Sequence, residues 1–293
     1  MSHAGCVWSA SGCAPLVCAV PYPAMSKLAE RYGPWAVITG ASAGIGAEFA
    51  RRVAERGINV VLVARRRNRL EALASMIEDM YRVEARVAPA DLTSRDVVQV
   101  LQPALAGIEV GLLINCAGFG SAGPFLDMDP SVQESMINVN CRAPILLTHE
   151  IVQGMRERGR GGVIFVSSVN AFCAARGMAN YNATKAYDLL FAEGLAAELR
   201  PYGVDVQALC PGGTLSEFQG VAGLDTRNFG PFARLMFATP TSVVATSLRT
   251  LGRHVTVIPG LLNKLTVLTM RVMPRRVSTW LFGLVMERFA AGS

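Results

Sequence analysis

A tyrosine and a lysine one helical turn apart are the residues of this chain best suited to acid–base chemistry. Tyr181 and Lys185 are four residues apart, so a helix would place both side chains on one face. A phenol normally has a pKa of about 10, and we expect the nearby ammonium to lower the pKa of Tyr181 toward the working range. Ser168, thirteen residues before the tyrosine, could hold the oxygen that gains or loses the proton. This combination suits the interconversion of a carbonyl and an alcohol.

A glycine-rich turn near the start of the chain predicts a phosphate-binding site. Residues 35–38 predict a short buried strand and residues 47–56 predict a helix, with the sequence TGASAGIG between them at residues 39–46. A helix that begins at such a turn directs free N–H groups and the positive end of its dipole toward an anion. The spacing differs from the common G-x-G-x-x-G fingerprint, so a turn without a ligand is the alternative.

Basic residues after the second predicted strand, residues 58–63, indicate the type of dinucleotide. An acidic residue at this place would bind a ribose 2′-hydroxyl and favour NAD. This chain has Arg65, followed by two further arginines. A guanidinium pairs with a 2′-phosphate, so we expect NADP. The alternative is a solvated basic start to the helix predicted over residues 68–80.

These motifs together resemble the short-chain dehydrogenase/reductase family over residues 35–260. Three further segments match: Ala90 to Thr93, Asn115 to Gly118, and Pro211-Gly212. Cys116 replaces an asparagine of the family pattern, and Thr214 begins an altered form of the segment after Pro211-Gly212. The cofactor-binding residues that the resemblance implies are Gly40, Ser42, Gly44, Ile45, Gly46, Arg65, Asp91, Leu92, Asn115, Ala117, Gly118, Tyr181, Lys185, Pro211, Gly212 and Thr214.

The resemblance also implies a catalytic set of Asn140, Ser168, Tyr181 and Lys185. Asn138 is a second candidate for the asparagine, but the residues after Asn140 fit the family pattern better. In such a set Tyr181 gives a proton to the substrate oxygen that Ser168 holds. Lys185 lowers the pKa of Tyr181 and binds the nicotinamide ribose, while Asn140 holds a water that links Lys185 to solvent.

The implied function is NADPH-dependent reduction of a ketone to a secondary alcohol. Residues 198–212 are similar to the branch that contains hydroxysteroid dehydrogenases and long-chain 3-oxoacyl reductases. Residues 217–238 are rich in Phe, Leu and Gly, which favours a hydrophobic acyl or steroid-like substrate. A cofactor-binding sensor or scaffold without turnover is the alternative function, although a scaffold has no need of all four catalytic residues.

Alternating strand and helix patterns predict an α/β fold, a single Rossmann domain with a doubly wound, mostly parallel sheet. The net charge of +6 is modest, and no basic run is interleaved with aromatic residues, so we expect no nucleic-acid partner. Seven cysteines form no C-x-x-C pair, and with three histidines they offer no metal site. Free thiols are typical of a reducing compartment, so we expect a cytoplasmic protein.

The two ends of the chain differ from residues 25–260, the predicted catalytic domain. Residues 1–24 lack periodicity and predict a disordered tail, with Met25 as the expected start of the working protein. Residues 261–293 predict an amphipathic helical extension with five basic residues and one acid, interrupted at Pro274. Its apolar face could cover the substrate cleft or contact a second subunit of a homo-oligomer. It could instead lie on an anionic membrane surface, since its apolar runs are too short to span a bilayer.

Overall fold

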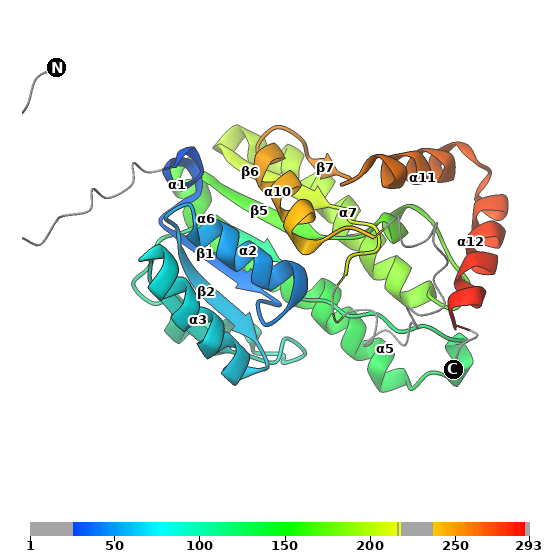
Figure 1. The fold of residues 1–293 in the computed structure, drawn as a ribbon, viewed down its shortest axis with the longest axis horizontal. Helices are drawn as coiled ribbons and strands as arrows, with labels where there is room; N and C mark the ends of the chain where they lie inside the picture. Colours follow the sequence, from blue (N-terminus) through cyan, green and yellow to red (C-terminus); the bar gives the residue numbers. More distant parts are fainter. Residues whose placement is uncertain (1–25, 216, 218–236, 291–293) are drawn as a thin grey trace, which may run out of the picture.

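The centre of the protein is one parallel sheet (Figure 1). The computed structural model describes residues 26–215, 217 and 237–290. Within these residues the seven strands lie in the order β3-β2-β1-β4-β5-β6-β7. The strands are β1 (Trp35–Thr39), β2 (Asn59–Ala64), β3 (Ala85–Pro89), β4 (Val110–Asn115), β5 (Gly161–Val166), β6 (Val204–Leu209) and β7 (Thr256–Val257).

Helices cover both faces of the sheet, as the doubly wound prediction requires. Each face has its own hydrophobic core, one centred on Phe49 and Leu70 and the other on Leu147 and Phe165. The first face packs against α2 (Gly44–Ala54), α3 (Arg67–Tyr81) and α10 (Pro240–Thr250). The second packs against α4 (Val97–Leu105), α6 (Ala143–Arg158) and α7 (Ala179–Leu199).

The strand order reverses between β1 and β4. The chain adds β2 and β3 on one side of β1, then returns to pair β4 with the other side of β1. Every residue of β1, β4 and β5 is buried, which is why these strands are almost continuous apolar runs. In open parallel sheets ligands bind at the carboxyl ends of the strands beside such a reversal. The topology therefore places a binding crevice where the glycine turn lies.

Several predicted boundaries agree closely with the structure. The strands predicted at residues 35–38 and 58–63 correspond to β1 and β2, and α11 (Leu261–Val272) ends just before Pro274 as predicted. The helix expected from residue 47 begins earlier, at Gly44, because the glycine turn itself forms the first helical turn. A short helix, α1 (Lys27–Tyr32), was not predicted and is capped by Ser26.

Two predictions concern residues outside the described part of the chain. One is the disordered tail over residues 1–24. The other is the apolar lining expected from most of residues 217–238, of which the structure describes only Glu217, Phe237 and Ala238.

The C-terminal extension forms two helices, α11 and α12 (Arg275–Ala290), drawn in orange and red in Figure 1. The side of α11 that is buried against the chain carries Asn263, Val267 and Met270. On α11 the predicted apolar face is exposed, so it does not cover the chain's own cleft, and contact with a second subunit or with a membrane stays a prediction. This exposed face comprises Leu261, Leu265, Leu268 and Val272. No helix among the described residues is long and apolar enough to cross a membrane.

Candidate active site

The first turns of α7 place the predicted tyrosine and lysine beside the carboxyl end of β5. Tyr181 and Lys185 are both buried, one helical turn apart. Ser168 follows β5 directly, and its Oγ accepts a hydrogen bond from the backbone N–H of Asn170 at 3.1 Å. A side-chain hydrogen bond joins Ser168 to Tyr181. The structure therefore brings together three of the four residues of the predicted catalytic set.

The pKa of Tyr181 differs in direction from the sequence prediction. Burial raises this pKa, whereas the charge of Lys185 and the hydrogen bond with Ser168 lower it. Burial outweighs both, and the pKa of Tyr181 lies above its ordinary value. The expectation of a pKa lowered toward neutrality is therefore wrong in this structure. Because the phenol keeps its proton at neutral pH, it is poised as a proton donor.

Lys185 has a buried partner that the sequence analysis missed. Its Nζ donates hydrogen bonds to the carbonyl oxygen of Val166 and to Oδ2 of Asp188, both at 2.9 Å. Burial alone would lower the pKa of Lys185, but Asp188 and Tyr181 raise it, so the amine stays charged. Burial also raises the pKa of Asp188, and the ammonium opposes that rise. The spacing of three residues on a helix was the signal that could have found Asp188.

Asn140 lies in a π-helical turn, Asn138–Arg142, between α5 (Pro130–Ile137) and α6. Such turns are rare and frequently occur at functional sites. The Asn140 side chain is buried; its Oδ1 accepts from the N–H of Phe119 at 3.1 Å, and its Nδ2 donates to Oγ1 of Thr184 at 3.0 Å. Thr184 is the neighbour of Lys185 on α7. Asn138, the other candidate, is only partly buried.

The glycine turn after β1 packs against the loop after β4. Gly40 has a φ of +69°, and a Cβ there would lie 2.9 Å from Cα of Ala117. A Cβ at Gly46 would lie 2.3 Å from the carbonyl oxygen of Gly40. Thr39 joins the two loops, because its Oγ1 accepts from the N–H groups of Cys116 and Ala117, each at 3.0 Å. These contacts leave no room for side chains, which explains the glycines and assigns Thr39 a positioning role.

The basic residues after β2 interact with two different loops. Arg66, which the sequence analysis did not select, donates from Nε and Nη2 to Oγ of Ser42 at 3.2 and 2.9 Å. Its Nη1 also pairs with Glu217 at 2.8 Å, and Arg69 pairs with the same carboxylate at 2.5 Å. Hydrogen bonds from Thr93 lower the pKa of Asp91, and Arg65 contributes to this lowering. The basic cluster thus borders both the glycine turn and the loop after β3.

The predicted cofactor residues gather at one edge of the sheet. They follow the carboxyl ends of β1, β2, β3, β4, β5 and β6, although they span residues 40 to 214 in the sequence. Oδ1 of Asn115 is buried there without a hydrogen-bond partner among the described residues. A Cβ at Gly118 would lie 3.3 Å from Nζ of Lys185, so the backbone closely approaches the catalytic helix. This edge combines the backbone N–H groups of the glycine turn, an acceptor without a partner and basic side chains, a combination that fits a dinucleotide cofactor.

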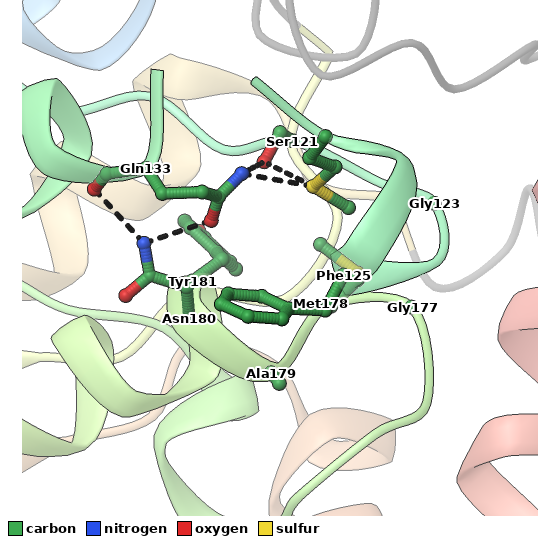
Figure 2. A pocket seen from close by; sticks show the side chains of 10 residues that line it. Ser121, Gly123, Phe125, Gln133, Gly177, Met178, Ala179, Asn180 and Tyr181 are labelled. Atoms are coloured by element: carbon green, nitrogen blue, oxygen red, sulfur yellow. Dashed lines mark hydrogen bonds between the residues drawn. The ribbon is translucent and has the colours of Figure 1, made fainter. Parts of the chain in front are cut away.

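A small pocket opens beside Tyr181, and Figure 2 shows its lining. One side carries polar groups fixed by mutual hydrogen bonds: Nε2 of Gln133 donates to Oγ of Ser121 at 3.0 Å, and Nδ2 of Asn180 donates to Oε1 of Gln133 at 2.9 Å. The other side carries apolar side chains. The complete lining is Ser121, Gly123, Phe125, Met128, Gln133, Gly177, Met178, Ala179, Asn180 and Tyr181.

Comparisons with known proteins agree with this arrangement. Residues 34–225 match the family described as short chain dehydrogenase. A 7beta-hydroxysteroid dehydrogenase of Collinsella aerofaciens is 32% identical over 238 residues, covering 81% of this chain and 90% of that protein. A very-long-chain 3-oxoacyl-CoA reductase of Homo sapiens is 34% identical over 183 residues, covering 61% of this chain and only 59% of that reductase.

A solved structure supports the same assignment. A short-chain dehydrogenase from Sphingobium yanoikuyae in complex with NADPH is 33% identical, with a TM-score of 0.72. The match covers 83% of this chain and 97% of that one. Since the family match covers well over half of the sequence, the chain belongs to the short-chain dehydrogenase/reductase family.

Proposed function

We propose that this protein is an NADPH-dependent reductase that converts a hydrophobic ketone to its secondary alcohol. The observation that carries the proposal is the buried group of Ser168, Tyr181 and Lys185 at the same edge of the sheet as the glycine turn. When bound, NADPH would supply the hydride, while the protein supplies orientation and electrostatics.

The side chains divide the acid–base work. Tyr181 Oη gives its proton to the carbonyl oxygen of the substrate. Ser168 Oγ accepts from the N–H of Asn170 and is hydrogen-bonded to Tyr181, and with substrate bound its proton would be directed to the same carbonyl oxygen. The ammonium of Lys185 stabilises the phenolate that Tyr181 becomes, and Asp188 keeps that ammonium charged. Asn140 would complete the set by holding a water that links Lys185 to solvent.

NADP is the proposed form of the cofactor. Arg65 and Arg66 would pair with the 2′-phosphate, and Ser42, which already accepts from Arg66, would border the same group. The N–H groups of the turn from Gly40 to Gly46 would hold the pyrophosphate at the N-terminus of α2. The NADPH complex of the Sphingobium yanoikuyae relative supports this choice.

The proposed substrate is a bulky apolar ketone of the steroid or 3-oxoacyl type. The names of the two curated relatives support this class. Within this chain, Phe125, Met128 and Met178 provide apolar surface in the pocket beside Tyr181. Gln133 and Asn180 could orient a polar substituent of the substrate.

Ketone reduction is tested by following NADPH oxidation with three substrates: a steroid ketone, a long-chain 3-oxoacyl thioester and a small polar ketone. We expect turnover of at least one apolar ketone and little turnover of the polar one. A protein that binds NADPH but oxidises it with none of these ketones would instead support the sensor or scaffold alternative. The complete catalytic set argues against that alternative, since cofactor binding alone does not require a proton donor.

A further inference from the structure

Helix α11 exposes a continuous line of large apolar side chains, here called the C-terminal stripe. The stripe consists of Leu261, Leu265, Leu268 and Val272, which are 73%, 51%, 58% and 78% exposed. Their spacing of four, three and four residues aligns them along one side of the helix. Single exposed apolar residues are common, but a contiguous exposed patch of this kind marks an interaction surface.

The stripe points away from the rest of the protein because the opposite side of α11 is anchored. Asn263 is buried and its Nδ2 donates to the carbonyl oxygen of Pro259 at 2.8 Å. A Cβ at Gly212 would lie 2.3 Å from Oδ1 of Asn263, so α11 packs directly on the Pro211-Gly212 turn. Val267 and Met270 are buried on the same side. Rotating the helix to bury the stripe would break these contacts.

Helix α12 adds a second exposed apolar side. Ser278 is buried, and Gly283 lies against Arg176, since a Cβ at Gly283 would be 3.3 Å from the Cβ of Arg176. The exposed large apolar residues of α12 lie on another side of the helix: Val277, Trp280 and Leu281, of which Trp280 is 63% exposed. A tryptophan with one apolar body and one polar N–H is typical of the membrane–water interface.

The charged residues of α11 and of the first part of α12 all have one sign. Residues 261–283 contain four basic residues and no acidic one. The four are Lys264, Arg271, Arg275 and Arg276, all exposed. If two copies met through this surface about a two-fold axis, their basic residues would face one another, and residues 261–283 of the second copy would supply no acidic side chain to neutralise them. An anionic lipid surface supplies the missing negative charge and accepts the apolar side chains.

We propose that α11 and α12 dock this protein on the surface of an anionic lipid bilayer, with the C-terminal stripe in the interfacial layer. The docking surface is connected to the active site. Arg271 lies 4.8 Å above the ring of Phe172, in the short helix Val169–Phe172 that directly follows Ser168. Docking would therefore hold the active-site side of the chain close to the lipid, where apolar ketones concentrate.

The proposal is tested by flotation of the full chain with vesicles of phosphatidylcholine alone or mixed with phosphatidylglycerol. We expect binding to the anionic vesicles that weakens at least tenfold between about 0.05 and 0.5 M salt. Leu265→Ser combined with Leu268→Ser should reduce binding roughly tenfold or more by removing apolar contact. Met80→Ser is the matched control, because Met80 is 64% exposed on α3 and should leave binding unchanged.

A second pair of variants tests the charges separately. Arg275→Gln with Arg276→Gln should weaken binding to anionic vesicles about tenfold. Arg249→Gln with Arg253→Gln, on α10 and just after it, removes the same charge elsewhere and should not. Failure of the full chain to bind anionic vesicles would overturn the proposal. The proposal would also be overturned if sedimentation velocity showed that the full chain self-associates and that the stripe variant does not, while the same variant still bound vesicles. The C-terminal stripe would then contact a second copy of the chain.

Discussion

Nζ of Lys185 donates a hydrogen bond to Oδ2 of Asp188 over 2.9 Å, and both side chains are buried on the same helix. The pair lies beside Tyr181, whose pKa is raised by burial and lowered by Lys185. A buried ammonium without a counter-charge is costly, so the carboxylate lets a charged lysine remain next to the phenol. Asp188 is therefore a positioning residue for the proposed chemistry.

Asp188→Asn should destabilise the protein and change its pH profile. It leaves the buried ammonium without its carboxylate, which should lower the free energy of unfolding by about 3 kcal/mol. The pKa of Lys185 should fall because the negative charge that stabilises its ammonium is removed. Denaturant unfolding and the pH dependence of kcat measure the two effects. The exposed Asp79→Asn is the control, and equal stability losses for both variants would contradict the buried-pair argument.

Tyr181→Phe should abolish turnover while cofactor binding remains. The variant keeps the buried ring but removes the proposed proton donor to the substrate oxygen, so we expect kcat to fall at least about a hundredfold. Titration of NADPH fluorescence should give a Kd within a few-fold of the unaltered protein. Near-normal reduction by this variant would show that another group donates the proton.

The raised pKa of Tyr181 predicts opposite pH dependences for the two directions of the reaction. A phenol whose pKa lies above its ordinary value of about 10 keeps its proton through the neutral range. Ketone reduction uses the protonated phenol, so its kcat/KM should stay level from about pH 6 to 9 and decline only beyond. Alcohol oxidation uses the phenolate and should accelerate over that range. A reduction rate that declines around neutral pH would contradict this assignment.

Cofactor preference should depend on the arginines after β2 and on Glu217. Arg65→Ala and Arg66→Ala should each weaken NADPH binding more than NADH binding, because only NADPH carries the 2′-phosphate. Glu217 pairs with Arg66 and Arg69, so Glu217→Gln should free both guanidinium groups. These ion pairs are exposed, and we expect the Kd for NADPH to decrease by no more than about fivefold. Equal changes in the Kd values for NADPH and NADH would show that these residues do not bind the 2′-phosphate.

Gly46→Ala should damage the glycine turn. The added Cβ would lie 2.3 Å from the carbonyl oxygen of Gly40, so the backbone must shift. We expect a loss of about 2 kcal/mol in unfolding free energy and much weaker cofactor binding. Gly194→Ala, an exposed site on α7 with no atom within 4 Å of the new Cβ, is the matched control and should stabilise by up to about 1 kcal/mol. Comparable losses of unfolding free energy at both sites would contradict the explanation that the close contact at Gly46 causes the damage.

The sequence by itself determined the features that depend on local order. Strand and helix periodicity predicted the doubly wound sheet, because each element must turn its apolar residues toward a neighbour. The glycine turn was predictable since strand, turn and helix follow one another directly. Tyr181 and Lys185 were predictable for the same reason, as they share one helix. The family pattern then selected Asn140 over Asn138, which agrees with the burial of Asn140.

Only the tertiary structure decided the contacts between distant segments. Thr39 meets the loop after β4, and Asn140 meets Thr184 on α7, through hydrogen bonds that no local spacing encodes. The pKa of Tyr181 depends on how completely the fold removes water from its hydroxyl. The sequence predicted that Lys185 lowers this pKa, but it could not show that burial raises the pKa by more. The spacing of apolar residues predicted the apolar face of α11 but left open what covers it, and only the structure shows that this face does not pack on the chain itself. Asn263, held by Pro259 and packed on Gly212, fixes the helix with that face outward.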